Sequence, residues 1–181
     1  MNTQDKYPTS MRVLHWLMAI LIFGQIFGGW FMTPYDEARE PLVGQLYWWH
    51  KSFGLLAFLF IFIRLTNRLR HVPPELPASL PAFDRKLAHF AHWAIYFLIV
   101  LLPITGYTLS STFEYSDGIT FFGIHVPELF PKNETAYEAA DWLHAILAYT
   151  LLAVIVLHLA GVIKHRYFDK NPDNDVLQRM L

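Results

Sequence analysis

Four long apolar runs constrain the fold of this chain more than any other feature of its sequence. They cover about residues 12–31, 43–65, 87–110 and 141–163. Each is close to the roughly 20 residues that a helix needs to cross the hydrocarbon core of a bilayer. In lipid, a single segment can pair its own backbone polar groups only as a helix. The sequence therefore predicts an all-α membrane protein with four transmembrane helices.

Composition agrees with this prediction and excludes several classes of site. Charged residues make up 16% of the 181 residues and hydrophobic residues 54%, whereas soluble domains average about 25% charged residues. The length suits one unit, so we expect residues 1–181 to form a single integral-membrane domain. No cysteine is present, which excludes disulfides, zinc thiolate sites, iron–sulfur ligation and covalent attachment of a c-type haem. The net charge of −1 argues against nucleic acid and leaves membrane lipid as the expected surroundings.

The segments between the runs indicate where the helices end. The stretch after the second run carries four prolines, in "HVPPELPASLP", and proline favours an extended link over a helix. The longest connection, residues 111–141, is expected to hold a short helix or an interfacial segment. No small-residue cleavage site follows the first run, so we expect that run to be kept as a span and not removed as a signal peptide.

Positive charge predicts the orientation of this up-down bundle. Of the 14 Lys and Arg residues, only three lie on the side of the membrane that the chain reaches after the first and third runs: Arg39, Lys51 at the start of the second run, and Lys132. All the others lie at the N-terminus, in the link after the second run or in the C-terminal tail. Because cytoplasmic loops are enriched in Lys and Arg, both termini are predicted to be cytoplasmic. The expected location is the bacterial inner membrane, crossed several times.

Histidines occupy the fourth run at two depths. In "WLHAILAYTLLAVIVLHLAG", His144 and His158 are separated by about 21 Å along a helix and by only about 40° around it. With the predicted directions of the spans, His50 lies near the outer end of the second run and His15 near the inner end of the first. The histidines therefore match in depth as an outer pair, His50 with His144, and an inner pair, His15 with His158.

Two neutral imidazoles on facing helices are a ligand set for a six-coordinate haem b, so the sequence predicts two non-covalent haems. A single membrane histidine is more often bonded to a carbonyl or to water, but four at matching depths make coincidence a poor explanation. Metal transport is also a poor explanation for the four histidines, because carboxylates and thioethers are scarce beside them. With both axial positions filled, such haems carry electrons and do not bind oxygen.

The sequence resembles the bacterial cytochrome b561 family of four-helix dihaem membrane proteins along nearly its whole length. The resemblance rests on "RVLHWLMA", "YWWHKSFG", "LAHFAHWAIYFLIVLLPITGY", "DWLHAILAY" and "VLHLAGVIKHRYF". It implies that His15, His50, His144 and His158 are the haem ligands. It also implies electron transfer to or from a quinone of the respiratory chain, either ubiquinone or menaquinone.

Further candidates carry two interpretations each. His89 and His92, near the inner end of the third run, could support the inner haem or a quinone pocket, or could simply bond to the interface. Arg64 could pair with a haem propionate, or could mark topology by reaching to the membrane surface.

The resemblance places His165 in a quinone-side cluster, where it could donate to a quinone carbonyl and pass a proton. The alternative is that His165 belongs to a solvated basic tail. In "LLPITGY", Pro103 and Gly106 predict a kink that opens a cofactor crevice or serves packing.

The predicted function is that of a membrane electron-transfer cytochrome that exchanges electrons with the quinone pool. One alternative, superoxide:ubiquinone oxidoreductase, is an activity of one branch of the family, although the acidic outer loops disfavour an anionic substrate. Another alternative is a cytochrome b anchor subunit that takes electrons from a periplasmic dehydrogenase or hydrogenase as its redox partner. A histidine membrane protein without redox function is the third.

Overall fold

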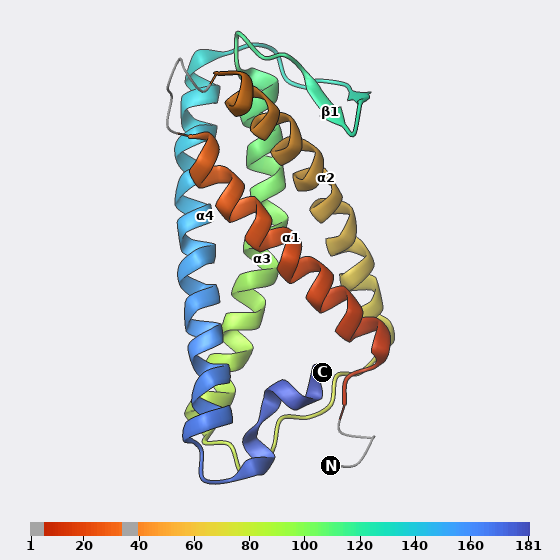
Figure 1. Cartoon of the computed structure of the whole chain (residues 1–181), viewed down its shortest axis with the longest axis vertical. Coiled ribbons are helices and arrows are strands. Elements are labelled where there is room, and N and C mark those ends of the chain that lie inside the picture. Colours follow the sequence, from red (N-terminus) through yellow and green to blue (C-terminus); the bar gives the residue numbers. More distant parts are fainter. Residues whose placement is uncertain (1–5, 34–39) are drawn as a thin grey trace.

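The computed structural model describes residues 6–33 and 40–181, and four long helices dominate it (Figure 1). Their bounds are α1 (Thr9–Met32), α2 (Glu40–Arg70), α3 (Ala82–Thr112) and α4 (Glu134–Ile163). Each is long and apolar enough to cross a membrane, so the predicted four-span bundle is confirmed. All four extend beyond the predicted apolar runs, because helical structure continues into the polar ends that lie outside the hydrocarbon. Arg39, which entered the charge argument, lies outside the described residues.

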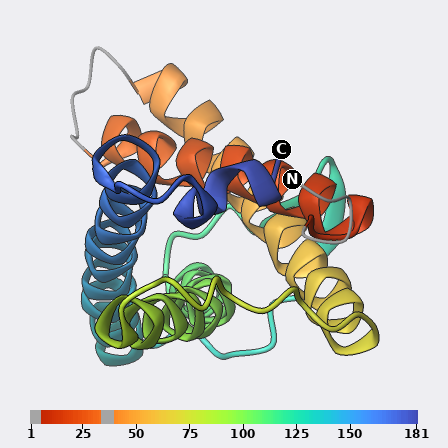
Figure 2. The same ribbon diagram turned by 90° about the horizontal axis from the view of Figure 1, so that it is seen from below.

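The bundle consists of two helix pairs, α1 with α2 and α3 with α4, which are joined mainly where α2 meets α3 (Figure 2). A core at mid-height is built from all four helices and contains Met18, Ile61, Leu98 and Leu151, each at most 5% exposed. The core therefore lies between the two depths at which the histidines occur.

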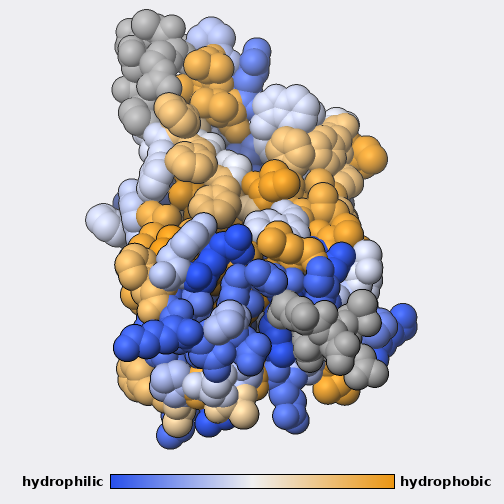
Figure 3. All heavy atoms as spheres, turned by 60° about the horizontal axis from the view of Figure 1, so that its bottom comes forward, coloured by the Kyte–Doolittle hydropathy of each residue, from blue (hydrophilic) through white to orange (hydrophobic). Residues whose placement is uncertain are grey.

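Most of the remaining apolar surface faces outward. Only a small part of each span is buried inside the protein, as expected for helices whose solvent is lipid. Hydrophilic residues gather at the end that carries both termini, with hydrophobic residues above them (Figure 3). The structure thus places the termini at one end of the bundle, while the assignment of that end to the cytoplasm rests on the charge distribution.

The two proline features of the sequence have different outcomes. Residues 71–81 contain no helix, as their prolines predict. Pro103 lies inside α3, which stays helical on both sides of it, and the lower half of α3 is inclined relative to the upper half in Figure 1. Thr105 adds a hydroxyl contact to the carbonyl of Leu101, and such a bond to the preceding turn also bends helices.

The connection between α3 and α4 forms a β-hairpin, so of the two alternatives expected there, a short helix or an interfacial segment, the short helix is wrong. Strand β1 (Ile119–Phe121) pairs antiparallel with β2 (Ile124–Val126) through a two-residue turn. Both turn residues have positive φ, 49° at Phe122 and 92° at Gly123, as a type I′ hairpin requires. The apolar, β-branched residues on each side of a glycine were the sequence signal for this hairpin.

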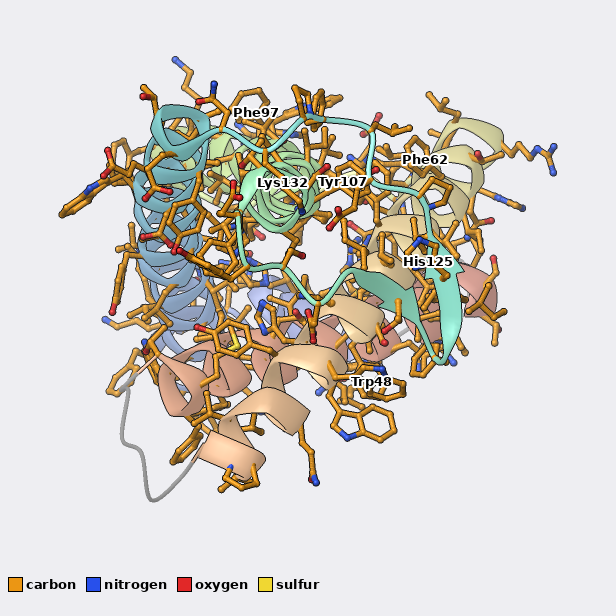
Figure 4. The ribbon with its side chains drawn as sticks, turned by 90° about the horizontal axis from the view of Figure 1, so that it is seen from above. Trp48, Phe62, Phe97, Tyr107, His125 and Lys132 are labelled. Atoms are coloured by element: carbon orange, nitrogen blue, oxygen red, sulfur yellow. The ribbon has the colours of Figure 1, made fainter. Side chains whose placement is uncertain are left out.

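The hairpin is fixed to α2 by the two residues that follow His50. Ser52, fully buried, donates its hydroxyl to the Thr120 carbonyl at 3.1 Å and accepts from the Phe122 N–H at 3.1 Å. Lys51 donates to Asp117 at 2.7 Å and to the Gly118 carbonyl at 3.0 Å. Seen from above, the hairpin with His125 lies over α2, and Trp48 projects from the outer side of that helix (Figure 4). The hairpin is thereby held beside the outer histidine position.

The C-terminal segment folds across the other end of the bundle. It contains a π-helix, η3 (Lys164–Phe168), and two 3-10 turns, η4 (Pro172–Asn174) and η5 (Val176–Arg179). Arg179 donates to the Glu75 carbonyl, and the Arg179 carbonyl accepts from the Tyr7 N–H at 3.0 Å. The indole N–H of Trp16 donates to the Met180 carbonyl at 2.9 Å. The segment thus ties α1 and the α2–α3 link together directly below the inner histidines.

We expect Asn174→Ala to loosen this segment without unfolding the bundle. Asn174 is 3% exposed, accepts from the Ser79 hydroxyl at 2.6 Å and donates to Asp169 at 2.8 Å. Its loss removes both hydrogen bonds, at a net cost of about 0.5–1.5 kcal/mol each. Amide hydrogen exchange should therefore accelerate in residues 169–180 and stay unchanged in α3 and α4. The exposed Asp173→Ala is the matched control, and equal exchange in both variants would contradict this account.

Candidate functional site

The outer pair of predicted ligands meets across the bundle. His50 on α2 and His144 on α4 face each other with ring centroids 6.4 Å apart and ring planes at 76°. Two metal–nitrogen bonds of about 2 Å, as found for imidazole on zinc, plus about 1 Å from each nitrogen to its ring centre require about 6 Å. The separation therefore suits one metal ion held between the two rings.

Glycines leave room around both of these rings. A Cβ at Gly28 of α1 would lie 3.6 Å from His50 Nδ1, and one at Gly106 of α3 would lie 3.1 Å from His144 Cε1. The second distance is shorter than ordinary carbon contacts, so the His144 ring packs directly on the backbone of α3. Gly54, four residues after His50 on α2, is not near either ring: a Cβ there would lie 3.5 Å from the side-chain oxygen of Gln25.

The two outer rings differ in their hydrogen bonds. His144 Nδ1 lies 2.9 Å from the hydroxyl of Thr105, which is only 8% exposed. His50 Nδ1 is buried and has no hydrogen-bond partner among the described residues. A buried polar atom without a partner costs free energy, and a metal bound at Nε2 of His50 would leave this Nδ1 as it is. Thr105 was missed by the sequence argument; the only available signal was its place beside Pro103 and Gly106.

The inner predicted ligands lie in a cluster of different composition. His158 on α4 is closest to His92 on α3, with ring centroids 5.4 Å apart. His15 on α1 is within electrostatic range of both, and its Nδ1 lies 3.1 Å from Nη2 of Arg64. The structure thus brings His92 as well as His15 to the neighbourhood of His158. The assignment of His15 and His158 as a ligand pair remains a prediction.

Arg64 is the charged centre of this inner cluster. Its Nε donates to the Tyr96 hydroxyl at 3.0 Å, and the guanidinium groups of Arg64 and Arg68 lie 5.4 and 5.6 Å from the Tyr96 ring centre. Among the described residues, neither arginine forms an ion pair with a carboxylate. The inner end therefore carries uncompensated positive charge next to the histidines.

The other two histidine candidates are placed differently. His89 is exposed on α3, which fits a helix-end residue better than a pocket residue. His165 is 9% exposed within the π-helix η3, not in a solvated tail. Its Nδ1 lies 3.0 Å from Asp169 and its Nε2 lies 3.7 Å from Asp84 of α3. The ring is therefore held between two carboxylates.

This chemistry defines a class of site. No group of three or more His, Cys, Asp or Glu side chains that could bind a bare metal ion occurs in residues 6–33 and 40–181. Facing imidazoles suit a metal whose remaining ligands come from a planar macrocycle, and without cysteine that macrocycle is held non-covalently. Fold and site together are those of a four-helix membrane protein that binds haem of the b type.

Comparison with known proteins identifies the family. A model of the prokaryotic cytochrome b561 family matches residues 6–181. Cytochrome b561 homolog 2 of Escherichia coli (strain K12) is 31% identical over 185 residues, covering 99% of this chain and 93% of that protein. "Probable superoxide oxidase CybB" of Yersinia pestis is 28% identical, covering 97% of this chain and 96% of that protein. Cytochrome b561 homolog 1 of E. coli is 24% identical, covering 97% of each.

The chain therefore belongs to the prokaryotic cytochrome b561 family. It is a multi-pass protein of the bacterial inner membrane and a b-type cytochrome of electron transfer, as the apolar runs and histidines of the sequence predict.

Proposed function

We propose that this protein carries electrons between two haems b and exchanges them with the quinone pool at the end that bears the termini. His50 and His144 hold the outer haem, and His15 and His158 hold the inner one, within one domain formed by residues 1–181. The 6.4 Å separation of the His50 and His144 rings is the observation that carries the proposal. The glycine backbone of α1 and α3 beside these two rings supports it.

When bound, haem supplies the one-electron chemistry, and the protein supplies ligation, orientation and a dry surrounding. Imidazoles on both faces leave no open position for oxygen or substrate at the metal. The apolar core of Met18, Ile61, Leu98 and Leu151 lies between the two histidine levels. It excludes water from the space that electrons cross.

Arg64 is assigned to the carboxylates of the inner haem. An arginine in a span whose hydrogen-bond partners are a tyrosine and a histidine carries a charge that a propionate would neutralise, and arginine recognises carboxylates bidentately. Because arginine nitrogens only donate, the contact with His15 uses the Nδ1 lone pair. If Nε2 of His15 is the metal ligand, the proton of the neutral ring lies on Nδ1, and Nδ1 can no longer accept from Arg64. Arg64 must then direct its donors toward the propionates and away from this ring.

His165 is assigned to proton transfer on the quinone side. Asp169, beyond the spanning segment, accepts from His165 Nδ1 and from Asn174, and these bonds lower the pKa of Asp169 to about 2. Asp169 is therefore ionised at neutral pH and fixes the orientation of the His165 ring. The other ring nitrogen faces Asp84, so the imidazole can pass a proton between the polar end of α3 and a reduced quinone. His92, adjacent to His158, is assigned a supporting position at the inner haem.

Alanine replacements of the four ligands test the proposal most directly. We expect His50→Ala and His144→Ala to remove the same haem, and His15→Ala and His158→Ala to remove the other, because each haem needs both of its axial ligands. Haem content per chain and reduced-minus-oxidised spectra measure this. His125→Ala, in the hairpin, is the control and should keep two haems. A wild-type preparation that contains one haem or none under full haem supply would refute the dihaem proposal.

Replacement of His165 tests the quinone assignment. We expect His165→Gln to keep both haems and to slow reoxidation of the reduced protein by a water-soluble quinone about 10²-fold or more, as for loss of a general acid–base group. His71→Gln, on the same end in the α2–α3 link, should react at the wild-type rate. Equal rates in the two variants would remove His165 from the proposal without affecting the haem ligands.

A second candidate function is oxidation of superoxide, the activity that appears in the name of the Y. pestis relative. The structure bears on it through the two described outer lysines. Lys51 pairs with Asp117 at 2.7 Å and Lys132 with Glu128 at 2.8 Å. The bond from Lys132 lowers the pKa of Glu128, so this carboxylate is charged at neutral pH. The two ion pairs offset the attraction that these lysines would exert on an anion. A periplasmic redox protein as the donor is equally compatible with such acidic loops.

Stopped-flow decay of superoxide with quinone present distinguishes these donors. We expect no acceleration over the spontaneous rate. If superoxide is a substrate, the decay accelerates, Asp117→Asn accelerates it further because it frees the charge of Lys51, and added salt weakens the gain. Such a result would replace the periplasmic donor with superoxide.

A further inference from the structure

Thr105 and Gly106 of α3 lie against the Nδ1 side of the His144 ring. The hydroxyl oxygen of Thr105 lies 2.9 Å from His144 Nδ1, 3.2 Å from the Leu101 carbonyl and 3.0 Å from the Leu102 carbonyl. This group of contacts is the part of "LLPITGY" that helix packing alone does not explain.

The positions of the protons in this contact follow from which groups can donate a hydrogen bond and which can only accept. A threonine hydroxyl has one proton, and a backbone carbonyl can only accept. When the hydroxyl proton points to the Leu101 or Leu102 carbonyl, the Thr105 oxygen is left as an acceptor. His144 Nδ1, 2.9 Å from this oxygen, then bonds to it as an N–H donor. The neutral ring then has its proton on Nδ1 and its lone pair on Nε2, which is free to bind a metal.

Gly106 makes this contact possible. A Cβ at this position would lie 3.1 Å from Cε1 and 3.4 Å from Nδ1 of His144, so any side chain here would push the ring away from Thr105. His50 provides a contrast, because its Nδ1 has no hydrogen-bond partner in the described part of the chain. Of the two facing rings, only His144 is thus oriented by a hydrogen bond to protein.

We propose that Thr105 is a positioning residue for the outer haem, which fixes the tautomer and orientation of His144 and raises its basicity as a ligand. The inference rests on the proposed role of His144 as a ligand. A ligand that donates its second N–H to an acceptor binds metal more tightly, and such partners are worth about 10- to 100-fold in metal affinity. A more basic ligand also favours the oxidised metal, so Thr105 holds the reduction potential of the outer haem below the value it would have without this bond.

The test compares Thr105→Val, which keeps the shape and removes the acceptor, with Thr105→Ser, which keeps the hydroxyl. Thr108→Val is the matched control, because Thr108 bonds the Ile104 carbonyl at 2.9 Å on the same helix and has no histidine contact among the described residues. Each full-length holoprotein is assayed for the rate of haem transfer to apomyoglobin, for the potential of each haem, and by electron paramagnetic resonance of the oxidised haems.

We expect Thr105→Val to lose the outer haem about 10- to 100-fold faster than wild type, to raise its potential and to change its resonance signal, with the inner haem unchanged. Thr105→Ser and Thr108→Val should match wild type. The inference is overturned if Thr105→Val matches Thr108→Val in all three measurements, or if Thr105→Ser is as impaired as Thr105→Val. If His144→Ala keeps both haems, the assignment of His144 as a ligand fails. If His144→Ala loses one haem while Thr105→Val behaves like wild type in all three measurements, only the role of Thr105 fails.

Discussion

The cost of an imidazole in hydrocarbon is the constraint on which the rest of this structure depends. A ring with two polar nitrogens inside a span must find a partner there, and water is not available. His144 satisfies Nδ1 on Thr105 and faces His50 with its other side. These histidines are paired across the bundle. The pair still lacks a group that accepts a lone pair from each ring, and a planar metal cofactor is such a group.

Both ends of the bundle are closed by segments that lie next to histidines. At the outer end, Ser52 and Lys51 fix the hairpin to α2 just after His50. At the other end, the C-terminal segment bonds the indole of Trp16, the neighbour of His15. A haem exposed to water exchanges more readily, so these covers are part of how a non-covalent cofactor is kept. They also restrict the reactants that can approach, which is why the charges on the hairpin matter for an anionic substrate.

The outer and inner sites differ in the charged groups that surround them. At the outer site, the rings of His50 and His144 contact glycine backbone and a threonine hydroxyl. The inner site contains Arg64 and Arg68 without carboxylate partners among the described residues, and next to it His165 is held between Asp84 and Asp169. Fixed positive charge stabilises a reduced centre, and a histidine between carboxylates can handle protons. Under the proposed function, electron transfer coupled to quinone protonation would therefore take place at the inner end.

The sequence by itself determined the four spans, their order, the extended proline link and the depth of each histidine. These follow from hydropathy and from the fixed rise of a helix, which are local properties of the chain. The meeting of His50 and His144 was also predictable, because depth leaves each outer histidine one partner. Tertiary structure alone decided the rest: that His158 lies beside His92 as well as near His15, that Thr105 stands behind His144, and that His165 is buried and not in a solvated tail. Those contacts depend on how the helices rotate and cross, and on the bend of α3 near Pro103. Hydropathy fixes how deep a residue lies in the membrane, but not which neighbour its side chain meets there.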